Sequence, residues 1–232
     1  MAVADVRLLW CRITRMTFLD TMLFSAPLLA PSETLACQPH VPPDWHKGRQ
    51  DYAVWLLEIE QNDVQQRLQQ ARSHLDTWLM DSERQAHITL AIAGFLVEQP
   101  RYNDDACPQQ LAAQCRKLRE QPPHALSLKI GGLDSFASAA FLEVGDPKQH
   151  LPGLRQRLAH GDDFRDSPYL PHLTVGLYRK RLQAAQVQAK LRSFPSTEPL
   201  HLYCKSISLC RYRADRVQGP LHCIERFPLC PG

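Results

Sequence analysis

Two short sequences in this chain have the residue types and spacing that acid–base chemistry requires. His87 and Thr89 form one His-x-Thr sequence, and His172 and Thr174 form another much later in the chain. Each lies in an apolar run and is followed by an aliphatic residue. A single short match arises easily by chance, so the weight comes from the matching positions and flanks. The repetition predicts two equivalent positions of a duplicated lobe.

Both segments have the character of β-strands. Successive side chains of a strand point to opposite faces, so each His shares a face with the Thr two residues later. The alternate residues then face a core; these are Ile88, Leu90, Leu173 and Val175. Two such strands, if adjacent, bring two imidazoles and two hydroxyls around one point.

Two histidines suit concerted acid–base catalysis, because an ordinary pKa of about 6.5 lets one be neutral while the other is protonated. A hydrolysis that needs a base for the attacking water and an acid for the departing oxygen can use such a pair. Threonine hydroxyls two residues away can donate to oxygens on which charge develops. We therefore predict His87 and His172 as catalytic residues and Thr89 and Thr174 as substrate-binding residues, without a metal ion.

The residues around both motifs resemble those of the 2H phosphoesterases, especially their 2′-5′ RNA ligase-like branch. The first motif of that family reads H-x-T-L-x-(aliphatic or aromatic)-x-G, which residues 87–94 fit. The second reads P-H-x-T-(aliphatic), which residues 171–175 fit. Residues 125–144 resemble the strand pair in the middle of the family's chain. The resemblance covers roughly residues 50–228.

This resemblance implies an α+β fold with two lobes, each an antiparallel sheet flanked by helices, around a central cleft. It implies a cyclic phosphodiesterase or 2′-5′ RNA ligase-like hydrolase that acts on RNA ends or small nucleotides with a 2′,3′-cyclic phosphate. The product would carry a 2′-phosphate, and the reverse reaction would form a 2′-5′ bond. The residues alone leave the acid and base unassigned; the resemblance favours His172 as base and His87 as acid.

Other functions stay open on the sequence. One is hydrolysis of a 2′-5′-linked or cyclic signalling nucleotide, and another is a non-catalytic RNA-binding module, although the intact His and Thr residues disfavour the module. Either His could be a half-buried structural residue, and Thr favours strands in any case. No Cys-x-x-Cys occurs, and the remaining histidines lack metal-ligand spacing, so we expect no metal or other cofactor.

The residues that follow the second motif are weaker candidates. Tyr178 could stack on a base and Arg179 could steer a phosphate, although such residues more often pack or face solvent. Many 2′-5′ RNA ligase-like members carry basic residues where this chain has Leu79 and Leu177. Arg84 precedes the first His by three positions. These departures concern the substrate more than the type of reaction.

Strands and amphipathic helices alternate along the chain. The strands are expected at 52–60, 85–97, 125–132, 138–145, 170–178, 200–212 and 221–227. The helices are expected at 62–79, 107–120, 149–160 and 182–192. A polar loop at 161–168 should lead into the second motif. Cys204 and Cys210 would share one strand and one face.

The composition fits one large or two small globular domains. Of the 232 residues, 44% are hydrophobic and 22% are charged, which is ordinary for such domains. A net charge of +3 tolerates a phosphate substrate without indicating a duplex-binding surface. The eight cysteines are expected to be reduced and mostly buried, because a chain of this length does not need disulfides.

Residues 1–45 carry no resemblance and are expected to form a poorly ordered or loosely docked extension, whereas 46–232 form the two-lobed domain. Residues 16–30 faintly resemble a secretory signal, but Asp20 and Pro27 interrupt the apolar stretch. No run approaches the ~20 residues of a membrane span. We therefore predict a cytoplasmic monomer that does not enter a membrane.

Overall fold

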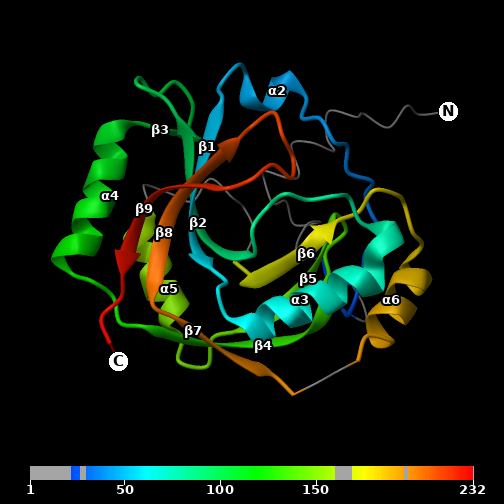
Figure 1. The fold of residues 1–232 in the computed structure, drawn as a ribbon. Helices are drawn as coiled ribbons and strands as arrows, with labels where there is room; N and C mark the ends of the chain where they lie inside the picture. The colour runs from blue at the N-terminus through cyan, green and yellow to red at the C-terminus, as the bar shows by residue number, and fades with distance from the viewer. Residues whose placement is uncertain (1–21, 27–29, 160–168, 196–197, 232) are drawn as a thin grey trace.

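The computed structural model describes residues 22–26, 30–159, 169–195 and 198–231. Most of the signal-like segment and the expected loop at 161–168 lie outside these ranges. Two β-sheets with helices on their outer sides make up the described structure (Figure 1). None of its described helices is long and apolar enough to cross a membrane.

The first sheet has five strands in the order β3-β2-β1-β8-β9. Its strands are β1 (Asp51–Glu58), β2 (His87–Leu96), β3 (Asp105–Ala106), β8 (Ser206–Arg213) and β9 (His222–Pro228). All neighbours pair antiparallel except β2 and β3, which are parallel. Trp55 and Leu57 on β1 enter one apolar cluster while Tyr52 and Val54 enter another. Both faces of β1 are thus covered, which explains its uninterrupted apolar sequence.

The second sheet has four antiparallel strands in the order β6-β5-β4-β7. Its strands are β4 (Leu126–Ser135), β5 (Ala139–Gly145), β6 (His172–Leu177) and β7 (Leu200–Cys204). The single strand expected at 200–212 is wrong, because the chain leaves this sheet after Cys204 and enters the other at Ser206. Cys204 and Cys210 therefore lie in different sheets. The buried apolar residues change phase at this point, from Leu202 and Cys204 to Ile207 and Leu209, because the chain changes sheet.

Five described helices accompany the sheets. They are α2 (Pro43–His46), α3 (Asn62–Leu75), α4 (Pro108–Glu120), α5 (His150–Leu158) and α6 (Ala184–Arg192). Val64, Leu68, Ala71 and Leu75 form the buried stripe of α3, with the helical spacing that the sequence predicted. The helix ends at Leu75, earlier than expected, and a 3₁₀ turn covers 76–78.

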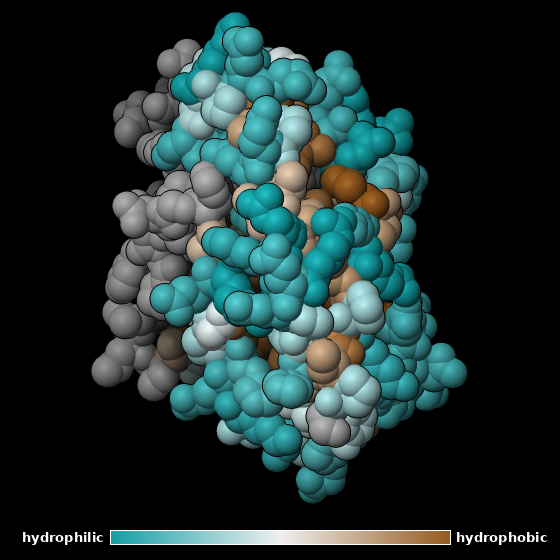
Figure 2. Space-filling view, turned by 90° about the vertical axis from the view of Figure 1, so that its left-hand side faces the viewer, coloured by the Kyte–Doolittle hydropathy of each residue, from teal (hydrophilic) through white to brown (hydrophobic). Residues whose placement is uncertain are grey.

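The helices tie the two lobes together. α3 follows β1 in the chain but packs on β6 and β7, whereas α5 follows β5 but packs on β2 (Figure 1). A shared apolar cluster includes Trp55 of the first sheet and Leu128 of the second. The two-lobed α+β class predicted from the sequence is confirmed, with one core common to both lobes. The face shown in Figure 2 is mainly hydrophilic, with hydrophobic residues in narrow patches.

The described part of the N-terminal extension belongs to the packed structure. Phe24 is 1% exposed and lies in the shared core. The backbone N–H groups of Leu35 and Cys37 donate to the carbonyls of Ala137 and Tyr178, at 2.8 and 2.7 Å. This packing differs from the loose docking expected from the sequence. The segment lacks helical or strand periodicity, and its partners lie far away in the chain, so no local pattern indicated them.

Gly94, the last residue of the first motif, has a φ of +119°, a conformation that other residues rarely adopt. A Cβ at this position would lie 2.5 Å from the carbonyl oxygen of Asp104. That same oxygen accepts a hydrogen bond from the N–H of Phe95 at 2.8 Å. Glycine therefore allows β2 to bend closely against the segment that leads into β3.

Candidate active site

The two motif strands meet where the two sheets come together. β2 and β6 belong to different sheets but are in contact. Ile88 and Leu90 of β2, and Leu173 and Val175 of β6, are all almost fully buried. Their partners in the alternation therefore face away from the core, as predicted. The adjacency that the sequence could only suppose is present in the structure.

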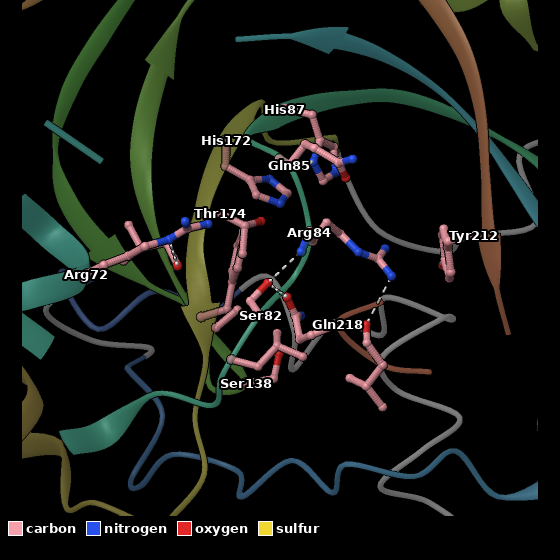
Figure 3. Close-up of a pocket in the computed structure, with 15 residues that line it drawn as sticks. Arg72, Ser82, Arg84, Gln85, His87, Ser138, His172, Thr174, Tyr212 and Gln218 are labelled. Atoms are coloured by element: carbon pink, nitrogen blue, oxygen red, sulfur yellow. Dashed lines mark hydrogen bonds between the residues drawn. The ribbon is translucent and has the colours of Figure 1, made fainter. Parts of the chain in front are cut away.

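A cavity of about 220 Å³ lies at this junction. His87, His172 and Thr174 line it, together with Arg72 from α3 and Arg84 from the segment before β2 (Figure 3). Thr89, the fourth predicted motif residue, is half-buried on the same strand as His87 but is not among the lining residues. The structure thus brings together three of the four motif side chains, with two arginines.

Both histidines are held in the same way. Nδ1 of His87 lies 2.8 Å from the carbonyl oxygen of Gln85, and Nδ1 of His172 lies 2.8 Å from that of Leu170. A carbonyl oxygen can only accept, so each Nδ1 must carry the hydrogen. In the neutral ring, Nε2 of each histidine then carries the free lone pair. The repeated contact fixes both the orientation and the tautomer of the two imidazoles.

Aromatic side chains also orient His172. Its ring packs edge-on against Phe136, with 5.1 Å between ring centroids, and against Phe141 at 5.6 Å. Phe141 lies on β5 and pairs with Thr174 in the strand register. The second His-x-Thr motif is therefore supported by the neighbouring strand, which restricts the motion of the imidazole.

The two arginines are anchored by backbone carbonyls. Nε of Arg72 donates to the carbonyl of Val175 at 3.1 Å. Arg84 donates to the carbonyls of Gly219 and Val217 at 3.0 and 3.1 Å. Its guanidinium also lies 3.9 Å from the ring centre of Tyr212. Neither arginine uses a carboxylate partner in these contacts, so their positive charges remain available to an anion.

Among the described residues that line the cavity, the side chains that can carry a charge near neutral pH are all basic. Its described lining contains two arginines and two histidines but no Asp or Glu. Burial, with repulsion from Arg84, His172 and Arg72, lowers the pKa of His87 to about 4, against the opposing effect of the Gln85 carbonyl. In the protein by itself, His87 is therefore neutral at pH 7. Such a site favours a bound anion such as a phosphodiester.

The two weaker candidates lie elsewhere. Tyr178 is fully buried, its hydroxyl lies 2.7 Å from that of Ser135, and burial raises its pKa to about 12. Stacking on a base, as suggested from the sequence, would require an exposed ring, so that suggestion is wrong. Arg179 is half-exposed and pairs with Asp81 at 3.3 Å. It does not line the cavity.

Arg72 and Arg84 supply the positive charge that Leu79 and Leu177 cannot. Leu79 is buried, and Leu177 contributes apolar surface to the cavity. Sequence patterns assigned no role to Arg84 and did not single out Arg72. Arg72 directly follows Ala71 of the buried stripe of α3, so it lies at the border of that stripe. Only the packing of α3 against β6 reveals that this border faces the cavity.

One group of side chains could in principle hold a metal ion. Among the described residues, the ligand atoms of Glu58, Cys210 and Cys223 lie within 4.8 Å of one another, outside this cavity. However, Arg226 already pairs with Glu58, and burial raises the pKa of Cys210 to about 12. Both features oppose the thiolate and the free carboxylate that a metal ion requires. These residues therefore do not enter the chemistry of the cavity.

Each of the two sheets contributes one His-x-Thr strand to the shared cavity. This arrangement defines the class of the 2H phosphoesterases. The family model described as 2′-5′ RNA ligase superfamily matches residues 61–216, and the chain belongs to this family. The recognition made from the two motifs is thereby confirmed. No curated protein matches the chain in sequence.

Solved structures show the same fold. Escherichia coli LigT in its apo form has a TM-score of 0.55 at 13% identity, over 79% of this chain and 99% of that one. TT0787 of Thermus thermophilus has a TM-score of 0.54 at 15% identity, over 77% and 97%. Escherichia coli LigT complexed with 3′-AMP has a TM-score of 0.52 at 14% identity, over 78% and 98%. At these identities the likeness supports the fold alone.

Proposed function

We propose that this protein is a metal-independent phosphodiesterase that opens 2′,3′-cyclic phosphates at RNA ends or on related nucleotides. The observation that carries the proposal is the pair of histidines in one cavity, each fixed through Nδ1 to a backbone carbonyl. The two arginines of the same cavity suit the charge of a phosphodiester. Family membership supports a phosphoesterase in general terms.

In the proposed reaction, Nε2 of His172 takes a proton from water as the water oxygen attacks phosphorus. The bond between phosphorus and O3′ breaks, and Nε2 of His87 gives its proton to O3′. The product carries a 2′-phosphate and a free 3′-hydroxyl. In the ligation reaction, a 5′-hydroxyl replaces water as the nucleophile on the cyclic phosphate, and a 2′-5′ bond forms.

His87 must be protonated to act as the acid, although the protein by itself holds it neutral at pH 7. Besides burial, the charges of Arg84, His172 and Arg72 keep its pKa low. A bound phosphate offsets those charges, so we expect His87 to take up a proton when the substrate binds. His87 therefore remains the proposed acid and His172 the proposed base, as the family resemblance favoured. His87 becomes protonated, and so able to act as the acid, only when the substrate is bound.

The remaining residues stabilise the phosphate. Thr174 lines the cavity beside His172, so its hydroxyl is placed to donate to a non-bridging oxygen. Arg72 and Arg84 attract the same group from two sides (Figure 3). We retain Thr89 as a proposed donor because it shares a strand face with His87. Arg179 is retained only as a weaker proposal, for steering phosphate from outside the cavity.

A substrate panel tests the proposal. It contains nucleoside 2′,3′-cyclic phosphates, RNA with a cyclic end, and 2′-5′-linked oligonucleotides, with products separated by the position of the phosphate. We expect cyclic substrates to yield 2′-phosphates, and His87→Ala and His172→Ala to abolish most of the turnover. Turnover confined to 2′-5′ linkages would favour a signalling-nucleotide hydrolase. RNA binding without turnover of any substrate would favour a non-catalytic module.

The proposal includes a cytoplasmic monomer. Cys115 and Cys204 are buried thiols, which suits a reducing compartment. The mainly hydrophilic face in Figure 2 suits a protein without a large apolar interface there. Fractionation and light scattering of the purified protein test these two points.

A further inference from the structure

A second hollow continues from the catalytic cavity along α3. Arg72, Arg84 and Gln85 line both, so the two spaces adjoin at these residues. Figure 3 shows Gln85 and Arg84 beside the catalytic histidines. We name the second space the α3 groove; its volume is about 950 Å³. It is within the size range of small-molecule sites in proteins.

Amide side chains form one wall of the α3 groove. Asn62, Gln66 and Gln69 lie on one face of the helix at spacings of four and three residues, and all three are exposed. The next residue of this stripe is Arg72, which reaches the catalytic cavity. An amide offers both a donor and an acceptor. The wall therefore suits a ligand with mixed hydrogen-bonding edges that is attached to an anion.

The charge of the α3 groove differs from that of the cavity. Glu58 and Glu60 both line the groove and both pair with the same guanidinium, that of Arg226. Two carboxylates thus face one arginine in this part of the groove, where Glu58 pairs with His87 in the strand register. A second phosphate beside these three side chains would meet excess negative charge. The groove suits the uncharged part of a nucleotide better than a continuing phosphodiester chain.

The described lining of the α3 groove includes no Phe, Tyr, Trp or His. Stacking on an aromatic ring, a common way to hold a base, is therefore not offered by these residues. Asn and Gln can instead pair with the edge of a base through two hydrogen bonds. Ile59, Leu68 and Leu221 also belong to the lining, but they are buried and offer little apolar surface to a base.

We propose that the α3 groove binds the base and ribose of the nucleotide whose cyclic phosphate occupies the catalytic cavity. It recognises the base edge through Gln66 and Gln69, and it favours a nucleoside that carries no second phosphate. This inference rests on the proposed function, because it assigns the nucleoside part of the same substrate. It narrows the substrate class towards nucleoside 2′,3′-cyclic phosphates with a free 5′-hydroxyl.

The test compares adenosine 2′,3′-cyclic phosphate with glycerol 1,2-cyclic phosphate, which has no base. The variant is Gln66→Ala with Gln69→Ala, and the control is Gln70→Ala, an exposed glutamine of the same helix outside the groove. Losing two hydrogen bonds should raise KM for the adenosine substrate roughly tenfold. The glycerol substrate and the control should keep wild-type values. Equal losses on both substrates, or no loss, would overturn the proposal.

A separate variant tests whether the carboxylates of the α3 groove disfavour a second phosphate on the substrate. Glu60→Gln should raise kcat/KM several-fold for adenosine 2′,3′-cyclic phosphate that carries a 5′-phosphate, and should leave the 5′-hydroxyl form unchanged. An unchanged ratio between the two substrates would overturn the preference for a nucleoside without a second phosphate. Measurements in low and high salt add a check, because the effect should shrink as salt screens the charges.

Failure of the proposed function can be told apart from failure of this inference. If the wild-type protein turns over none of these substrates, the proposed function falls. Calorimetric titration with adenosine 2′-monophosphate and with inorganic phosphate then tests the groove without turnover. Weaker binding of the nucleotide alone in the Gln66→Ala, Gln69→Ala variant supports the groove. Equal binding by variant and wild type would overturn it.

Discussion

The pH dependence of folding stability should report the burial of His87. Its pKa in the folded protein is about 4, whereas an unfolded histidine has the ordinary value of about 6.5. Between these values the unfolded chain binds the additional proton. Stability therefore falls as the pH drops from about 6.5 to about 4, and it is fully present above that window.

The magnitude follows from the two pKa values. Between about pH 7 and about pH 5, His87 alone should remove roughly 2 kcal/mol from the free energy of unfolding. The assay is urea unfolding of the wild type and of His87→Gln at both pH values. Other titrating groups act in both proteins and cancel in the comparison. The wild type should lose roughly 2 kcal/mol more than the variant.

A control and a second measurement sharpen this test. His124 is exposed, so His124→Gln should keep the wild-type difference between the two pH values. NMR titration of the His87 ring should show its pKa rising when phosphate is added, because the anion offsets Arg84 and Arg72. Equal pH dependence in His87→Gln and wild type would refute the burial argument. A pKa that phosphate does not move would refute the substrate-dependent acid.

Four further predictions concern activity and stability. His172→Ala should reduce turnover of a cyclic phosphate by roughly 10² to 10⁴, the usual effect of a positioned base, and near-wild-type rates would exclude it from catalysis. Thr174→Ala should cost about one to two decades in kcat with an unchanged melting temperature. Activity should survive EDTA; loss restored by one divalent ion would contradict the metal-free mechanism. Phe24→Ala should lower the free energy of unfolding by about 3–5 kcal/mol in urea titration, because the side chain is buried in the shared core.

Local patterns in the chain were sufficient to predict the strand faces of the two motifs. Ile88 and Val175 are buried while His87 and His172 face the cavity, because alternation along a strand is a local property. The motif flanks also indicated the family and thereby the two-lobed fold. The stripe of α3 was readable for the same local reason, since it depends only on helical spacing.

Which other side chains share the site depends on long-range packing. Arg72 lines the cavity because α3 packs against β6 of the other lobe. Tyr178 does not line the cavity, because its side chain is buried in the core. The docking of Phe24 is likewise invisible to local patterns. Each depends on contacts between segments far apart in the chain. A sequence pattern records whether a side chain is buried, but the partner that buries it is fixed only when the sheets and helices pack together.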